Sequence, residues 1–382
     1  MTSARLHAPA GACAPVRSAG TKPRLLILTP DFPPDHGGVQ VLVHGLALAM
    51  TGFEIEVVTL ERPGARRFDS GGELATWRVG ARVGGRPARM LSLNAAGLRR
   101  ALRFRPDVTL SAHVITSPAA TAVRRLLGGR TAQYFHANEI LGKPRLSAFA
   151  AARADVVIAV SAYTASLIAA TGASPMNLRL IPPGVDLPCD PGALPTERPT
   201  VLTTAQLKHS YKGHDVLIRA LAGVRARVPD VEWVVIGEGP LRASLEQLAS
   251  SCGLAGAARF LGEVTDEERD CWLRRADVFA MPSRLAGEGF GIVYLEASAY
   301  GKPIVAGNVA GALDAVADGV SGLLVDPTDP AAVGEAVTRL LLDRELAGRL
   351  GRDGAARARD FAWPVIAGRV EAALLEPTRT GS

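Results

Sequence analysis

The chain has 382 residues, of which 48% are apolar and 21% are charged, as in ordinary globular proteins. These fractions argue against a disordered, collagen-like or coiled-coil chain, and the length predicts two or three domains. The formal net charge of +6 is unevenly spread, because residues 1–190 contain 22 basic and 12 acidic residues whereas residues 191–382 contain 21 and 25. The first half is therefore expected to attract an anionic partner.

Most of this positive charge lies in segment 62–130, which contains 14 arginines and three acidic residues. Such a segment can attract an anionic membrane surface, or its arginines can simply be solvated residues of the protein surface. Binding to nucleic acid is not expected, because the arginines are not interleaved with aromatic residues, which make up 5% of the chain.

The cysteines and the N-terminal region predict a cytoplasmic protein, with peripheral contact to the inner face of the plasma membrane left open. The cysteines at 13, 189, 252 and 271 show no metal-ligand spacing and are too few for a disulfide scaffold. Residues 1–23 lack the apolar run of a signal peptide and are expected to form a disordered tail. The most apolar window, 149–172, contains Arg153 and Asp155, whereas a spanning helix needs about 20 predominantly apolar residues.

Short β-branched runs alternate with amphipathic stretches through residues 24–185, the expected first domain. Runs of this length between turn residues are typical of buried parallel strands, and helical patterns at 39–50 and 117–129 make them βαβ units. The expected strands lie at 24–30, 54–60, 107–113, 131–137, 155–161 and 178–184. This half is predicted to form a doubly wound sheet.

A proline-rich linker is expected at 186–199, because six prolines occur between residues 182 and 199 and proline cannot donate to a strand ladder. The alternation then resumes and predicts a second doubly wound domain over 200–360. The segment 361–382 is expected to form a helix that crosses back to the first domain. The predicted fold is thus α/β, with two Rossmann-like sheets whose strand carboxyl ends line a central cleft, where such folds bind ligands. The second set of strands is expected at 201–207, 231–237, 258–264, 277–283, 303–307 and 322–327.

Gly37 and Gly38 open the first helix, where backbone N–H groups can bind an anion and glycine lets a phosphate approach closely. Taken alone, two glycines before a helix are more often an ordinary turn. The pattern is not the G-x-G-x-x-G fingerprint, and Glu61 is the sole acid after the second strand in a ribose-binding position. A nicotinamide-dependent dehydrogenase is therefore poorly supported.

The densest signal is SRLAGEGFGIVYLEASAYGKPIVAG at 283–307. Glu288 lies in a glycine-rich loop before a helix, and Glu296 lies about two turns into that helix. Carboxylates can accept hydrogen bonds from sugar hydroxyls or from a ribose diol, while the N–H groups of Gly289 and Gly291 face a polar ligand. The alternative is that the two glutamates have no ligand and only interact favourably with the N-terminus of the helix.

Lys212 follows the first strand of the second domain and is one of only five lysines. An ammonium at this position can neutralise a leaving diphosphate, which is the main electrostatic need of a transfer from a nucleotide. The alternative is a solvated surface lysine.

Together these motifs resemble the retaining glycosyltransferases of family 4, which have the two-domain GT-B fold, over residues 24–361. The region around EGFGIVYLEA is most similar to the phosphatidylinositol mannosyltransferase type. The motifs that carry the resemblance are PPDHGGVQ, HANE, VSAYT, IPPGVD, YKGHDVLIRAL, VIGEGPLR, FLGEV, EGFGIVYLEA, GKPIVAG and GLLVDP.

The resemblance implies a role for each matching residue, with Glu288, Lys212 and His136 as the catalytic group. His136, which is otherwise an ordinary strand-end histidine, would contact the donor sugar on the acceptor side, and Asn138 and Glu139 would face the acceptor. The implied donor ligands are Glu288, Gly289, Phe290 and Gly291 for the sugar, Glu296 for the ribose, Lys212, Gly37 and Gly38 for the diphosphate, and Gly237, Glu238 and Val264 near the nucleobase.

One position departs from the family pattern. Most relatives carry an arginine that pairs with the diphosphate where this chain has Gln206. A neutral amide cannot supply that charge, so stabilisation of the leaving group would rest on Lys212, with Lys208 or Arg284 moving in. The change would lower the rate, indicate a different donor or mark an inactive paralogue. An active enzyme is favoured because the other donor residues are present.

The expected activity is transfer of mannose, glucose or N-acetylglucosamine from a GDP- or UDP-sugar to a hydroxyl acceptor, with retention at the anomeric carbon. Neither glutamate need act as a nucleophile, and no Asp-x-Asp motif is present, so neither a metal nor another cofactor is expected. The acceptor is lipid-linked or is a small molecule such as an antibiotic aglycone or a sugar phosphate. The rival hypotheses are a non-catalytic sugar-nucleotide-binding protein and a sugar-nucleotide epimerase, and the EGFGIVYLEA loop argues against the epimerase.

Overall fold

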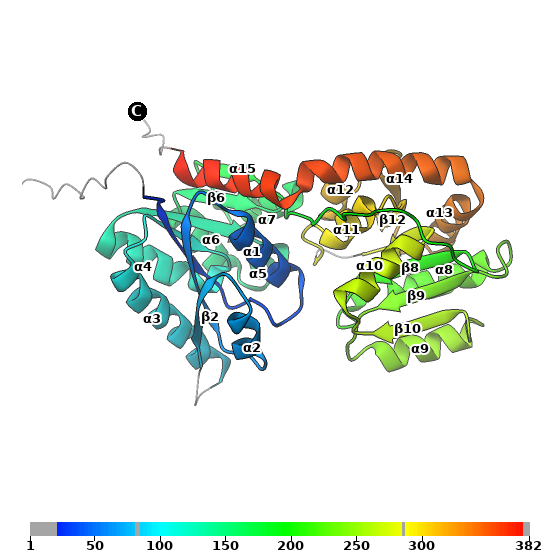
Figure 1. The fold of residues 1–382 in the computed structure, drawn as a ribbon, viewed down its shortest axis with the longest axis horizontal. Coiled ribbons are helices and arrows are strands. Elements are labelled where there is room, and N and C mark those ends of the chain that lie inside the picture. The colour runs from blue at the N-terminus through cyan, green and yellow to red at the C-terminus, as the bar shows by residue number, and fades with distance from the viewer. Residues whose placement is uncertain (1–20, 81–84, 285–286, 377–382) are drawn as a thin grey trace, which may run out of the picture.

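The computed structural model describes residues 21–80, 85–284 and 287–376, so most of the expected N-terminal tail and the end of the C-terminal segment lie outside the described residues. Two α/β lobes lie side by side (Figure 1). Each contains one parallel sheet with helices around it, which confirms the predicted pair of Rossmann-like domains. No helix in the described part of the chain is both long and apolar enough to span a bilayer.

The N-terminal lobe is built on a seven-stranded sheet in the order β3-β2-β1-β4-β5-β6-β7, in which all neighbouring strands are parallel. Its strands are β1 (Arg24–Leu28), β2 (Glu54–Leu60), β3 (Ala75–Val79), β4 (Val108–Ser111), β5 (Arg130–Phe135), β6 (Val156–Ala159) and β7 (Leu178–Leu180). Its helices are α1 (Gly38–Ala49), α2 (Ala65–Ser70), α3 (Arg86–Phe104), α4 (Ser117–Leu127), α5 (Ala137–Gly142), α6 (Pro144–Arg153) and α7 (Ala162–Ala170).

Strand β3 is the strand that the sequence pattern missed. It pairs with β2 alone, at the edge of the sheet, and none of its side chains is buried. A half-exposed edge strand does not carry the continuous apolar run by which the other strands are predicted.

The C-terminal lobe repeats this plan with six parallel strands in the order β10-β9-β8-β11-β12-β13. Its strands are β8 (Thr200–Thr204), β9 (Glu232–Ile236), β10 (Ala258–Gly262), β11 (Val278–Met281), β12 (Ile304–Gly307) and β13 (Gly322–Val325). Its helices are α8 (His214–Val224), α9 (Arg242–Ser251), α10 (Asp266–Arg275), α11 (Ile292–Ala299), α12 (Ala312–Ala315), α13 (Pro330–Leu342) and α14 (Arg344–Ala358).

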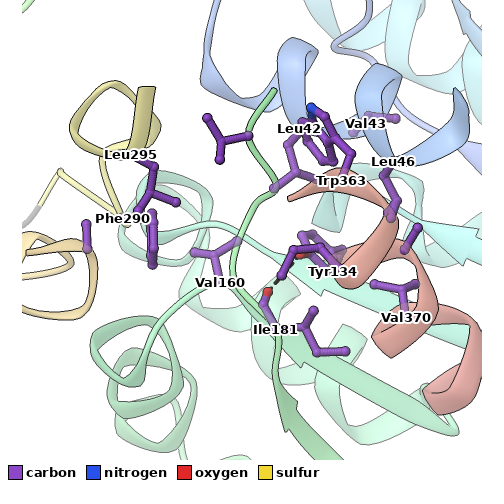
Figure 2. Packing of buried hydrophobic residues seen from close by; sticks show 14 of the residues in the cluster. Leu42, Val43, Leu46, Tyr134, Val160, Ile181, Phe290, Leu295, Trp363 and Val370 are labelled. Carbon is purple, nitrogen blue, oxygen red and sulfur yellow. Dashed lines mark hydrogen bonds between the residues drawn. The ribbon is translucent and has the colours of Figure 1, made fainter. Parts of the chain in front are cut away.

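Helix α15 (Trp363–Leu375) follows α14 and packs on the N-terminal lobe, drawn in red in Figure 1. Its first residue, Trp363, lies so close to α1 that a β-carbon at Gly45 would come within 2.4 Å of the indole ring. Figure 2 shows this indole beside Leu42 in the same buried cluster. The hydrophobic core of the N-terminal lobe therefore includes a helix from the end of the chain.

The chain also crosses between the lobes at the linker, residues 186–199. Just before the linker, Val185 pairs with Ala362 in an isolated parallel bridge, and the N–H of Val185 donates to the carbonyl of Phe361 at 2.8 Å. The two crossings of the chain therefore run side by side.

In both sheets the strand order reverses at one point, between β1 and β4 and between β8 and β11. Ligands of open parallel sheets bind outside the carboxyl ends of the strands at such a switch point. The loops that follow β1 and β8 meet across the cleft, where Gln206 Nε2 donates to the carbonyl of His36 at 2.7 Å. The two switch points thus face one another.

Candidate active site

The cleft between the lobes holds a cavity of about 440 Å³. Its walls are formed largely by loops and helix starts that follow strands near the two switch points. The predicted residues that line it are Gly37, Gly38, His136 and Asn138 from the N-terminal lobe and Gln206, Lys212, Gly237, Glu288, Gly289, Phe290, Gly291 and Glu296 from the C-terminal lobe.

A buried ion pair stands in the wall of this cavity, with Lys212 Nζ 2.6 Å from Glu288 Oε2. Only 18% of the lysine side chain and 8% of the glutamate side chain are exposed. Burial alone would lower the pKa of Lys212, but Glu288 and Tyr211 together outweigh burial and raise that pKa. The cavity therefore presents a permanent cation that can meet a phosphate and a carboxylate that can meet hydroxyl groups.

Gly213 lets the two loops that carry this pair touch one another. Its φ is +79°, and a β-carbon there would come within 2.0 Å of the carbonyl oxygen of Pro282. The loop after β8 can therefore lie directly on the loop after β11, which sets Lys212 against Glu288.

The glycine loop continues into α11, and the N-terminal end of this helix faces the cavity through Phe290 and Gly291. Because the helix begins at Ile292, Glu296 lies in its second turn and not about two full turns in, as the sequence suggested. Burial raises the pKa of Glu296, although Arg269 opposes the shift. In such a poorly solvated wall, a hydrogen bond from a ligand hydroxyl to this carboxylate is stronger than in water.

His136 lies between the end of β5 and the start of α5. Its Nε2 is 3.2 Å from the carbonyl of Ala112, and because a carbonyl can only accept, this nitrogen carries the ring proton. Burial lowers the pKa of His136 to about 4, although that hydrogen bond opposes the shift. The imidazole is therefore neutral at physiological pH and adds no charge to the cavity.

Asn138 lines the cavity, but the neighbouring Glu139 does not. Glu139 is buried, and its carboxyl oxygens accept from the N–H of His136 at 3.0 Å and of Val114 at 2.7 Å. Burial raises the pKa of Glu139 to about 8 in spite of these hydrogen bonds. The Glu139 side chain therefore holds the start of α5 against the loop after β4, and its expected contact with an acceptor stays a prediction.

Three further predicted residues also lie outside the lining of the cavity. Glu238 is exposed and pairs with Arg242 at 2.7 Å, and Val264 packs against the hydrophobic core. Arg284 pairs with Asp215 at 2.7 Å. The structure therefore does not place these three side chains at the cavity wall.

Neither suggested substitute for the missing arginine reaches the cavity wall. Arg284 and Lys208 are both outside the lining, and Gln206 uses its amide to bond with the carbonyl of His36. In the part of the chain that the structure describes, positive potential at the cavity comes from Lys212 and from the N-terminal ends of α1 at Gly38 and of α11 at Ile292.

Tyr211 and His209 line the cavity although the sequence reasoning did not single them out. Their rings are stacked, with centroids 5.3 Å apart and planes 19° apart, and Lys212 Nζ lies 5.4 Å from the centroid of the Tyr211 ring. Both residues could have been predicted from their position next to Lys212, on the loop that follows the first strand of the second sheet.

Sequence comparisons match both lobes to glycosyltransferases. The family model described as Glycosyltransferase Family 4 matches residues 36–188, and the one described as Glycosyl transferases group 1 matches residues 190–357. The GDP-mannose-dependent alpha-(1-6)-phosphatidylinositol monomannoside mannosyltransferase of Mycobacterium tuberculosis is 35% identical over 359 residues, covering 87% of this chain and 92% of that protein. The D-inositol 3-phosphate glycosyltransferase of Salinispora tropica is 37% identical over 238 residues, covering 56% of this chain and 49% of that protein.

Solved structures share the same two-lobed fold. Anabaena HepE in complex with UDP and glucose has a TM-score of 0.77 at 19% identity, over 93% of this chain and 100% of that chain. Sucrose-phosphate synthase from Thermosynechococcus elongatus has a TM-score of 0.77 at 22% identity, over 92% of this chain and 98% of that chain.

Proposed function

The chain belongs to glycosyltransferase family 4, and from this premise we propose that it moves mannose from GDP-mannose to a hydroxyl group of a phosphoinositol acceptor, with retention at the anomeric carbon. As a member of this family the protein is a glycosyltransferase that uses a nucleotide sugar. The choice of mannose and of the acceptor class rests on the relatives, whose names specify GDP-mannose and inositol compounds. The observation that carries the proposal is the buried Lys212–Glu288 pair in the cavity wall.

The cavity suits the chemical groups of a nucleoside diphosphate sugar. Lys212 and the N-terminal end of α1 lie on opposite lobes, so a diphosphate between them would meet positive potential from both sides. Glu288 and the Gly289 backbone would bind the hydroxyls of the sugar, and Glu296 would bind the ribose diol.

In the proposed mechanism, the bond between the anomeric carbon and the diphosphate oxygen breaks while the acceptor oxygen attacks on the same face. The acceptor proton passes to the departing phosphate oxygen. Lys212 stabilises the negative charge of that leaving group, which is where preformed electrostatics act most strongly. Glu288 orients the sugar and neutral His136 contacts it, and neither residue forms a bond to the anomeric carbon.

We propose that the transfer needs neither a metal ion nor a cofactor. Within the residues that the structure describes, no three His, Cys, Asp or Glu side chains converge as they would around a metal. Activity should therefore persist in EDTA, and loss of activity in EDTA that Mg²⁺ or Mn²⁺ restores would contradict this part of the proposal.

The first test is a thermal-shift comparison of GDP, UDP, GDP-mannose and UDP-glucose. A ligand that binds only the folded state raises the melting temperature. At a concentration of 100 times its Kd, it adds about 2.7 kcal/mol to the free energy of unfolding. GDP and GDP-mannose should raise it, and transfer of radiolabelled mannose to an inositol acceptor should follow. A larger shift with uridine nucleotides would assign a different donor. A shift without transfer to any acceptor would favour the sugar-nucleotide-binding alternative.

The arginine-rich segment supports a second part of the proposal, which is contact with an anionic membrane. Helix α3 exposes Leu91 and Leu102, together with Arg99 and Arg103, and α4 lies beside it in Figure 1. Not all of the arginines are free for such contact. Those paired within the lobe are Arg62 with Asp35, Arg78 with Asp69, Arg100 with Glu56 and Arg124 with Asp155.

Sedimentation with vesicles tests the membrane contact. Vesicles of phosphatidylcholine and phosphatidylglycerol should carry the protein down at low salt. The double variant Arg99→Glu, Arg103→Glu should lose this binding, while the matched variant Arg339→Glu, on the exposed side of α13 in the other lobe, should keep it. If the wild-type protein does not sediment with the vesicles, membrane contact is excluded and a soluble acceptor is the remaining hypothesis.

A further inference from the structure

Residues 308–315, which include α12, lie against the loop that carries Glu288. This loop, residues 287–291, is called the donor loop below. The N–H of Gly311 donates to the carbonyl of Glu288 at 3.0 Å. A β-carbon at Gly311 would come within 2.1 Å of the carbonyl oxygen of Gly289, so only glycine allows the two backbones to lie this close. The position of the donor loop therefore depends on the segment that begins α12.

The donor loop also contacts the N-terminal lobe. A β-carbon at Gly289 would lie 3.4 Å from the β-carbon of Ala137, at the start of α5, and 3.7 Å from Cγ2 of Val160, just after β6. Ala137 follows His136, which lines the cavity. Figure 2 shows Val160 and Phe290 in the same buried cluster, although they come from different lobes. The donor loop thus lies at the boundary between the lobes.

Asp314, in α12, makes a hydrogen bond that crosses between the lobes near the donor loop. Its Oδ1 accepts from the N–H of Ala162 at 3.1 Å. Ala162 is the first residue of α7, and the N–H groups in the first turn of a helix have no partner within the helix. A carboxylate at this end also interacts favourably with the helix dipole. Because Asp314 lies outside the lining of the cavity, it joins the lobes without touching the expected donor.

Arg357 holds the backbone of α12 in the C-terminal lobe. Its guanidinium donates to the carbonyls of Asp314 at 2.7 Å and of Ala315 at 2.5 Å. The guanidinium also lies 4.7 Å from the centroid of the Phe361 ring, and that ring is 6.0 Å from the ring of Phe290 in the donor loop. Because α12 is held in this way, the Asp314 carboxylate determines where α7 lies relative to the donor loop.

The backbone is strained immediately before Gly311. The φ of Ala310 is +52°, in the left-handed region that residues with a β-carbon seldom adopt. Strain of this kind persists where the surrounding structure determines the conformation, and it is concentrated at functional sites. The strained residue directly precedes the one that contacts the donor loop, which indicates that the placement of this segment matters to the site.

We propose that Asp314 is a positioning residue, which sets the donor loop against the N-terminal lobe through its hydrogen bond to the start of α7. This inference rests on the glycosyl transfer proposed above. Glu288 would hold the sugar from one lobe while His136 would contact it from the other, so the anomeric carbon is aligned only if the lobes keep their relative position. Lys212 and Glu296, which would bind the diphosphate and the ribose, lie in the same lobe as Asp314. Loss of the Asp314 contact should therefore slow transfer and leave the affinity for GDP nearly unchanged.

Two single variants remove this contact from its two ends. Asp314→Ala removes the acceptor, and Ala162→Pro removes the N–H, because proline has none. Proline is well tolerated as the first residue of a helix, Ala162 is exposed, and Ser161 before it already has the extended backbone that a following proline requires. With GDP-mannose and phosphatidylinositol in phosphatidylcholine vesicles, each variant should lower kcat at least about tenfold, because a misplacement of about 1 Å can cost about 100-fold.

Binding measurements and matched variants separate positioning from stability. Calorimetry with GDP should give nearly the wild-type Kd for both single variants, and the double variant should be no slower than the slower single one, since both changes remove the same interaction. Asp314→Asn keeps an oxygen that can accept from Ala162 and should recover most of kcat. Asp353→Ala, at an exposed carboxylate on α14, should behave as wild type. Melting temperatures check that each variant is folded.

Three results would overturn the inference: wild-type kcat in folded Asp314→Ala, a loss in Asp314→Ala that Ala162→Pro does not share, or losses that multiply in the double variant. A loss of GDP affinity as large as the loss of kcat would assign Asp314 to donor binding and would also overturn it. Failure of the wild-type protein to bind or turn over any sugar nucleotide is a separate result, which overturns the proposed function and the inference with it.

Discussion

Lys212 and Glu288 neutralise one another in a wall that water reaches poorly. A buried ion pair of this kind adds little net stability, but removing one partner leaves the other charge uncompensated. In the proposed donor complex, the diphosphate would replace the carboxylate as the partner of the ammonium, and the sugar hydroxyls would replace the ammonium as partners of the carboxylate. On this proposal, the pair keeps both side chains in place until the donor binds.

Single changes at this pair should abolish turnover without unfolding the protein. Lys212→Ala and Glu288→Gln are each expected to lower kcat by at least about 100-fold, as loss of one group that stabilises developing charge usually does. Initial-rate kinetics and the melting temperature measure the two effects separately, with Lys208→Ala as the control because Lys208 lies outside the cavity lining. Normal turnover in either folded variant would remove the pair from the site.

The charge that is missing at position 206 should be restorable. Gln206→Arg places a guanidinium beside the expected diphosphate and should tighten GDP binding about tenfold, since a charge-assisted hydrogen bond contributes about 1.5–3 kcal/mol. Gln206→Ala removes the hydrogen bond to His36 and adds no charge, so it should show no such gain. Titration calorimetry with GDP distinguishes the two variants. Equal affinities would mean that the diphosphate does not lie beside residue 206.

At the scale of elements, helix α5 has only six residues, and its start is held by a carboxyl group that burial keeps protonated. The pKa of Glu139 is about 8 in the folded chain against an ordinary value of 4.5. Between these values the folded state holds a proton that the unfolded state has lost, so the free energy of unfolding falls as pH rises. The stabilising effect is complete below the ordinary pKa and is lost progressively up to about pH 8.

Glu139→Gln should flatten this pH dependence, because an amide does not ionise. The wild-type slope from this group is at most about 1.4 kcal/mol per pH unit. Urea unfolding near pH 5 and near pH 8 measures it, and the variant should lose less stability than the wild type between the two. Parallel losses would show that Glu139 is already ionised in the folded lobe.

The contact between α1 and α15 can be tested with two glycines that differ in their surroundings. Gly45→Ala would drive a methyl group into the Trp363 ring and should destabilise the protein by about 1–3 kcal/mol. Gly368→Ala, on the exposed side of α15 with nothing within 4 Å of the added carbon, should stabilise it by about 0.5–1 kcal/mol. Denaturant unfolding of both variants gives the comparison. A neutral Gly45→Ala would mean that Trp363 moves freely.

At the scale of the whole molecule, the two sheets were predictable because a strand buried on both faces must carry a continuous apolar run, as β1 and β11 do. Their carboxyl ends then predicted the position of most of the residues that line the cavity. The positions of the remaining predicted residues depend on tertiary packing. The direction of the Glu139 side chain and the use of Arg284 by Asp215 depend on neighbours that are distant in sequence, and no local pattern reports them.

The uneven charge of the molecule should appear as a difference in salt sensitivity. The exposed Arg99 and Arg103 act through solvent, where the screening length falls from about 10 Å at 0.1 M salt to about 3 Å at 1 M, whereas Lys212 is largely shielded. Binding to anionic vesicles should therefore weaken with salt more steeply than binding to GDP. Sedimentation and calorimetry over this range measure both, and equal slopes would place the membrane contact away from these cations.

Because the chain crosses twice between the lobes, cleavage of the linker alone should not separate them. A protease that nicked the linker at 186–199 would leave a C-terminal fragment that still carries α15, the helix seated in the core of the other lobe. The N–H of Gly52 donates to Glu371 of that helix at 2.7 Å, which adds a polar contact to the hydrophobic one. The two fragments should therefore copurify as a complementing pair, so this enzyme can be split in the linker and reassembled without a covalent connection.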